Sequence, residues 1–220
     1  MKRSLLLGLA LGVLSSGQSL TIRVYNLANA PAGIISRASA VAGQILVQAG
    51  ITAIWEEGSP DSLEGQLTDM SPCGTVTATD TREYLVVSVA KGTSARVYPG
   101  ALGYALPCGR QGAHARIFYD RTVKLALGSN LRLDIGTLLG AEIAHEIGHV
   151  LLRSMEHSAR GIMKAKWGSM EFQELACKDL RFASNEVPRL RAGASGRFGS
   201  RPQVSNSPHI DLSNYRPVVR

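Results

Sequence analysis

The chain of 220 residues is poor in aromatic side chains, which make up 5% of it, and its charged side chains make up only 19%. Hydrophobic residues reach 45%, which is enough to build a core and excludes a disordered or collagen-like chain. The length excludes a large multidomain protein. It leaves room for one domain of ordinary size with appended segments.

Long apolar runs are absent except at the N-terminus, where Leu5–Leu14 follows the basic residues 2–3. This run is too short to cross about 30 Å of hydrocarbon as a helix, and small polar residues follow it. We therefore expect a signal peptide at residues 1–19, cleaved after Gly17 or Ser19, and no stable membrane anchor. The mature protein is expected outside the cytoplasm, secreted or periplasmic.

An excess of positive charge is absent from the body of the chain, although the net charge is +7. Residues 18–180 carry 15 basic and 15 acidic side chains, so the surplus lies at the two ends. We therefore expect no nucleic-acid partner. Residues 191–220 are rich in Gly, Ser, Pro and scattered Arg, and are predicted to form a disordered basic tail after a domain at residues 20–190.

Cysteine is scarce, with Cys73, Cys108 and Cys177 the only three. In an exported protein this number suggests one disulfide and one leftover thiol. Cys73 and Cys108 lie in turn-rich segments, whereas Cys177 lies in a helical pattern that is expected to pack inward. We predict a bond between Cys73 and Cys108, and the alternative is three reduced, separately buried thiols.

Periodicity predicts an α/β (α+β) fold with a five-stranded sheet and a helix behind it. The segment 84–89 is the most apolar strand and is expected at the centre, whereas 101–106 is interrupted by glycine and is expected at an edge. The other strands are predicted at residues 20–27, 51–55 and 115–119, and helices at about 32–49, 134–153 and 170–183.

The second predicted helix contains the sequence HEIGH, with His145, Glu146 and His149. Residues four apart lie one above the other on a helix, so the two imidazoles converge on one metal ion. Glu146, next to the first histidine, reaches a water bound to that metal. This spacing is typical of zinc hydrolases, in which three protein ligands hold the ion and a fourth position stays open.

The third ligand is less evident, and His157 is the nearest candidate. A helix continued from His149 would carry it about 12 Å along the axis, so the chain must turn back without Gly or Pro in the connecting segment. Glu171 and Glu174 on the next helix are the competitors, as in a gluzincin-type peptidase. Neither of them is followed by the Asp four residues on that this class favours.

Taken together, these residues resemble the metzincin clan of zinc metalloproteases, or a bacterial branch of it, over about residues 20–185. The resemblance rests on HEIGH, on a following histidine, and on Met163 in GIM, which is similar to the Met-turn beneath the zinc of that clan. The clan pattern has Gly and the third His where this chain has Leu152 and Met155, so His157 comes two residues later.

The resemblance implies a twisted mixed sheet and a zinc endopeptidase with one Zn²⁺ per chain, held by His145, His149 and His157. Glu146 would act as general base on the zinc-bound water and then protonate the leaving amine. A protein or peptide substrate would lie extended along residues 102–105. We expect a monomer.

Two other functions are compatible with the sequence. One is an exported zinc-binding protein without turnover, against which the presence of Glu146 argues, because a purely structural zinc site has no use for this carboxylate. The other is an interaction protein whose basic tail binds anionic cell-surface polymers. Removal of residues 192–220 would separate these functions from proteolysis.

Overall fold

The computed structural model describes residues 18–59, 84–92, 100–107, 113–128 and 133–198. The predicted disulfide partners Cys73 and Cys108 lie outside the described residues, as do residues 1–17 of the predicted signal peptide and residues 199–220 of the predicted tail. The first strand begins at Gln18, so cleavage after Ser19 would remove its first two residues.

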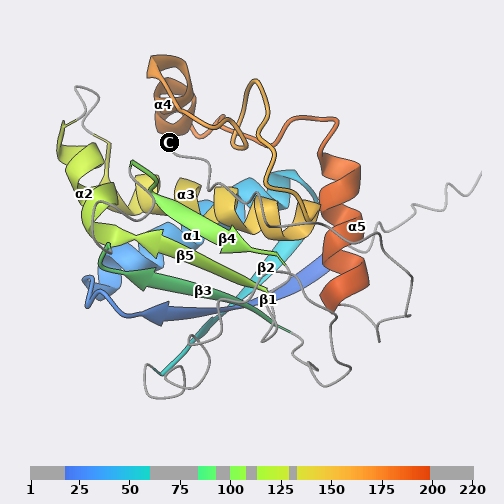
Figure 1. Ribbon diagram of the computed structural model, residues 1–220, viewed down its shortest axis with the longest axis horizontal. Coiled ribbons are helices and arrows are strands. Elements are labelled where there is room, and N and C mark those ends of the chain that lie inside the picture. The colour runs from blue at the N-terminus through green and yellow to red at the C-terminus, as the bar shows by residue number, and fades with distance from the viewer. Residues whose placement is uncertain (1–17, 60–83, 93–99, 108–112, 129–132, 199–220) are drawn as a thin grey trace, which may run out of the picture.

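A five-stranded mixed sheet lies at the centre of the fold, in the order β2-β1-β3-β5-β4 (Figure 1). Neighbouring strands run parallel except for β4, which pairs antiparallel with β5 at one edge. The strands are β1 (Gln18–Asn26), β2 (Ile51–Glu57), β3 (Tyr84–Ala90), β4 (Gly103–Leu106) and β5 (His114–Phe118). The architecture is therefore mixed α/β, as the sequence predicted.

Helices α1 and α3 cover one face of this sheet (Figure 1). Within the described residues the helices are α1 (Ala32–Gln48), α2 (Tyr119–Gly128), α3 (Ile135–Leu152), α4 (Ser169–Ala176) and α5 (Val187–Phe198). Alternate residues of the strands, such as Leu20 and Ile22 of β1, are fully buried in one cluster with Ile45 of α1 and Ile143 of α3. The period of two along a strand thus places one apolar face against the helices.

The two helices approach each other closely because α3 carries a glycine at their contact. A Cβ added to Gly140 would lie 2.5 Å from the backbone oxygen of Ala38 on α1. No other residue fits at this distance without moving one of the helices. The contact therefore fixes how closely α3, which carries the HEIGH sequence, packs beside α1.

The structure confirms most of the predicted elements to within one or two residues at each end. β3 is the central strand and β4 an edge strand, as the apolar pattern and the glycine predicted. The first helix begins after Pro31, which restricts the backbone at the first turn, and is followed by Gly50 with φ 78°.

Two predictions about helices are wrong, and one helix was not predicted. The helix predicted at 170–183 ends at Ala176, because Lys178 adopts a left-handed conformation with φ 62°. Helix α2 follows β5 directly and was not predicted. Residues 191–198, predicted as disordered tail, belong to α5, whose Leu190 and Ala194 are fully buried. Burial of these two side chains stabilises a helix that its Gly and Ser content disfavours.

Cys177 is a free thiol at the C-terminal end of α4, and its side chain is exposed. The expectation that it packs inward is wrong, because the helix ends there and does not continue into the core. In the part of the chain that the structure describes, no helix is long and apolar enough to cross a membrane.

Candidate metal centre

The helix that carries the candidate site is α3. Its sequence specifies where it begins but not where it ends. Asp134 is the N-cap, and its Oδ2 accepts a hydrogen bond of 2.8 Å from the N–H of Thr137. This bond satisfies one of the backbone donors that the first turn of a helix leaves without a partner. Almost all side chains of α3 are buried, so the helix is held on every side by packing.

His145 and His149 lie one turn apart on α3 and are almost fully buried, with 1% and 2% of their surface exposed. Their Nε2 atoms are 2.9 Å apart. The Nδ1 of His145 lies 2.7 Å from the backbone oxygen of Ile162, and the Nδ1 of His149 lies 2.8 Å from that of Ser154. A carbonyl oxygen only accepts, so Nδ1 carries a proton in both rings, which leaves Nε2 as the nitrogen available to a metal ion.

His157 reaches the same place because the chain reverses directly after α3. Arg153 adopts a left-handed conformation with φ 48°, and the N–H of Ser154 donates 3.3 Å to the oxygen of His149. This is the hydrogen-bond pattern that usually ends a helix at a glycine. An arginine thus makes this turn, which no Gly or Pro in the segment predicted, one residue later than the glycine of the metzincin pattern.

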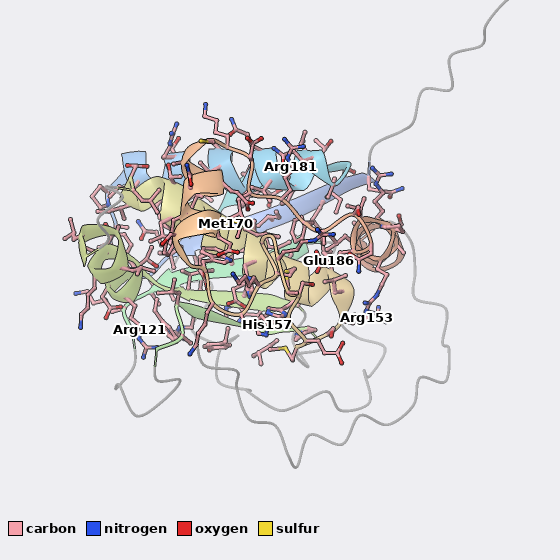
Figure 2. The ribbon with its side chains drawn as sticks, turned by 90° about the horizontal axis from the view of Figure 1, so that it is seen from above. Arg121, Arg153, His157, Met170, Arg181 and Glu186 are labelled. Atoms are coloured by element: carbon pink, nitrogen blue, oxygen red, sulfur yellow. The ribbon has the colours of Figure 1, made fainter. Side chains whose placement is uncertain are left out.

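The three histidines form a group whose ligand nitrogens all lie within 4.8 Å of one another. Figure 2 shows His157 beside α3 and Arg153 at the end of that helix. Nitrogens bound at about 2.0–2.1 Å to one tetrahedral zinc lie about 3.3 Å apart, so small ring rotations are enough to bind it. The donor set, three imidazoles with two of them oriented by carbonyls, fits zinc.

The competing ligands Glu171 and Glu174 do not belong to this group. Among the described residues, the three histidines are the only group that could hold a metal ion. Glu171 instead forms an ion pair of 2.6 Å with Lys164 and accepts a hydrogen bond of 2.8 Å from the N–H of Gly168. The Glu171 side chain is buried, and its carboxylate caps the start of α4 by accepting the Gly168 N–H, as the glutamate of a capping box does.

Two opposing effects act on the Glu171 carboxyl. Burial alone would raise its pKa, but the hydrogen bonds from Lys164 and Gly168 favour the charged form and hold the pKa below its usual value. Glu171 is therefore ionised at neutral pH. Its negative charge interacts with Lys164 and with the N–H of Gly168 at the start of α4.

Met163 lies beneath the group, as the GIM sequence suggested. The side chain is fully buried, and a Cβ added to Gly148 on α3 would collide with its sulfur. Gly148 stands directly before His149, so Met163 packs on the helix between the two histidine positions. The turn that brings it there uses Gly161, with φ 75°.

Glu146 points to the edge strand β4. A Cβ added to Gly103 would lie 3.0 Å from its Oε1 and 3.1 Å from its Cγ, so the side chain rests on the glycine. The residue as a whole is 4% exposed. A larger residue at position 103 would displace it, which explains the glycine that the sequence marked only as an interruption of a strand.

Sequence reasoning missed the groups that orient the histidines. The oxygen of Ile162 accepts hydrogen bonds from both His145 Nδ1 and Trp167 Nε1, the latter at 3.2 Å. The Trp167 ring also packs edge-on against His145, with 6.1 Å between the ring centroids. A backbone carbonyl has no sequence signal, so only Trp167, in a chain with two tryptophans, offered a hint.

Comparison with known proteins finds similarity among solved structures only. No family model matches the chain, and no curated protein matches it. Among solved structures, the chain is similar to the crystal structure of archaemetzincin from Methanopyrus kandleri, with 15% sequence identity and a TM-score of 0.46. The match covers 82% of this chain and 98% of that chain.

Proposed function

We propose that the protein is a zinc-dependent metallopeptidase of metzincin type. The observation that carries this proposal is the convergence of His145, His149 and His157 beside Glu146. Three imidazoles, with a carboxylate next to them in the chain that is not one of the ligands, are the donor set of a catalytic site. A structural zinc site is closed by four protein ligands.

Bound zinc supplies a Lewis acid that lowers the pKa of a water molecule toward 7 and polarises a peptide carbonyl. Glu146 follows His145 on α3 and is nearly buried against Gly103. In the proposed reaction its carboxylate accepts a proton from the attacking water and delivers it to the nitrogen of the leaving amine. Peptide hydrolysis needs this transfer because an amide anion is a very poor leaving group.

β4 is the proposed platform for the substrate. The N–H of Phe118 donates 2.7 Å to the oxygen of Leu102, and Tyr104 is paired with Arg116. Bonded and non-bonded pairs alternate in an antiparallel ladder, so the main-chain groups of Gly103 and Ala105 point away from β5 at the edge of the sheet. An extended peptide added there would place its backbone beside the Glu146 carboxylate.

The proposal is tested with zinc-loaded full-length protein and a broad set of peptides, by mass spectrometry of the products. Glu146→Ala is expected to bind zinc as the parent does and to lose cleavage by about 100-fold or more. Glu174→Ala, a glutamate outside the histidine group, is the matched control and is expected to cleave normally. Zinc binding without any cleavage by the parent would favour the binding protein without turnover.

We also propose that the protein is exported, on the basis of the basic and apolar N-terminal segment. The mass of the mature N-terminus from the producing cell tests this point. A chain that begins at Gln18 or Leu20 is expected, and a chain that retains Met1 would contradict export by a cleaved signal.

A further inference from the structure

A buried acid lies outside the histidine group and has no part in the proposed reaction. Glu186 is 5% exposed and stands immediately before α5. Its Oε2 accepts a hydrogen bond of 2.8 Å from the N–H of Ala183, and its Oε1 accepts a short one from the hydroxyl of Ser158. A buried carboxylate is costly to maintain unless its hydrogen bonds satisfy it, and here one of the two comes from a distant segment.

Ser158 directly follows His157, so its position determines where the third imidazole stands. Its N–H donates 2.8 Å to the oxygen of Met163, which ties the segment to the residue beneath the histidines. Among the described residues, its hydroxyl donates a hydrogen bond only to Glu186. Figure 2 shows Glu186 on the α5 side of the segment that carries His157.

Glu186 itself is held by α5, which is anchored to the helix of the other two histidines. The N–H of Leu190 donates 2.9 Å to the backbone oxygen of Glu186 in the first turn of α5. Further along, Gly193 packs against the backbone oxygen of Leu151 on α3 so closely that no Cβ fits between them. The carboxylate is therefore fixed relative to His145 and His149.

We propose that Glu186 is a positioning residue for the third metal ligand, acting through the Ser158 hydroxyl on His157. The inference rests on the proposed zinc site. His157 is the only one of the three histidines that does not lie on α3, so its place depends on the segment that follows the helix. Loss of the hydroxyl contact would let this segment sample positions from which His157 does not reach zinc. Residues that orient metal ligands are worth about 10–100-fold in metal affinity.

A purely structural role for Glu186 makes a different prediction. Its bond to Ala183 and its place before α5 would then only help α5 to begin. In that case Ser158→Ala would change the stability of the protein slightly and would leave zinc affinity unchanged. The two roles are therefore distinguished by whether Ser158→Ala lowers zinc affinity or only the stability of the protein.

The test measures zinc affinity by competition with a chromophoric chelator, and the urea stability of the metal-free full-length protein. Ser158→Ala keeps the bond between Glu186 and Ala183 and is expected to bind zinc about 10–100-fold more weakly than the parent. Ser158→Thr keeps a hydroxyl and is expected to restore most of the affinity. Ser195→Ala, the same change at a partly exposed serine of α5, is the matched control and is expected to have no effect.

A second variant keeps the test decisive if Ser158→Ala folds poorly. Glu186→Asp retains the charge but is shorter by one methylene, so it is expected to lose the bond to Ser158 and to lower zinc affinity to a similar extent. Combined with Ser158→Ala, it should lower zinc affinity little further, because both changes remove the same hydrogen bond. The visible spectrum of bound Co²⁺ should change in both variants but not in Ser195→Ala.

The outcomes distinguish this inference from the function on which it rests. A parent protein that binds no zinc overturns both. Tight zinc binding by the parent, abolished in His145→Ala but within twofold of normal in Ser158→Ala and Glu186→Asp, overturns the role of Glu186 and leaves the zinc site standing.

Discussion

The Nδ1 atom of His149 lies 2.8 Å from the backbone oxygen of Ser154, which belongs to the turn that leads to His157. One short segment therefore serves two of the three histidines, because it orients the ring of the second and carries the third into place. The shape of this turn depends on Arg153, whose φ of 48° is rarely adopted by a residue with a side chain.

Replacement of Arg153 by glycine should stabilise the protein. Glycine adopts the left-handed conformation without steric cost, so we expect a gain of about 0.5–1 kcal/mol in the free energy of unfolding, measured by urea denaturation of the metal-free protein. Arg153→Ala is the control, because it removes the same exposed side chain but keeps the strain. If the glycine variant were no more stable than the alanine variant, the turn would not be strained as described.

Replacement of Gly103 by alanine should impair cleavage and leave zinc bound. The added methyl would lie 2.7 Å from the oxygen of Arg116 and 3.0 Å from Oε1 of Glu146, so β4 or the carboxylate must move. A displacement of about 1 Å can lower a rate about 100-fold. Steady-state cleavage and zinc content are measured on the same preparation.

The matched control for this change is Gly33→Ala on α1, where an added Cβ meets no atom within 4 Å. It is expected to cleave normally. Normal cleavage by Gly103→Ala would show that Glu146 does not act from the position it occupies against β4.

The ion pair between Glu171 and Lys164 should make the free energy of unfolding depend on pH. The folded-state pKa of Glu171 lies below its usual value, so its contribution is fully present above the pKa of the unfolded chain and is lost as the pH falls through the folded-state pKa. We expect Glu171→Gln to be less stable than the parent by about 1–2 kcal/mol at pH 7. The difference should shrink below about pH 4.3, the usual pKa of a glutamate.

This pH dependence is measured by urea denaturation of the metal-free proteins, with Glu174→Gln as control. Zinc affinity of Glu171→Gln at neutral pH is expected to stay near that of the parent, because Glu171 is not in the histidine group. A difference that is constant from pH 7 to pH 3 would show that the charge of Glu171 is not the stabilising group.

Much of the fold could be predicted because its strands and its long helices carry strong local signals. The apolar periodicity of α3 and its cap Asp134 define the helix that presents His145 and His149. Glycine in β4 marks the edge strand beside Glu146. In these segments the local preference and the tertiary packing agree, so the pattern alone is sufficient.

The remaining features depend on tertiary contacts that have no local signal. α5 is rich in Gly, Ser and Arg, and it is helical because Leu190 and Ala194 are buried. The reversal at Arg153 opposes the intrinsic preference of the residue. Glu171 looks like an ordinary exposed helix residue until Lys164, seven positions earlier, is folded beside it. Such features could not be predicted from the sequence of either partner alone.

We propose that three histidines, and no carboxylate, bind one zinc. X-ray absorption at the zinc edge of the zinc-loaded full-length protein identifies these ligands, because scattering from imidazole rings is distinctive. We predict one zinc per chain with three imidazole nitrogens at about 2.0–2.1 Å, and two imidazoles in His157→Ala. A parent spectrum with only two imidazoles, or one that His157→Ala leaves unchanged, would rule out the three-histidine site.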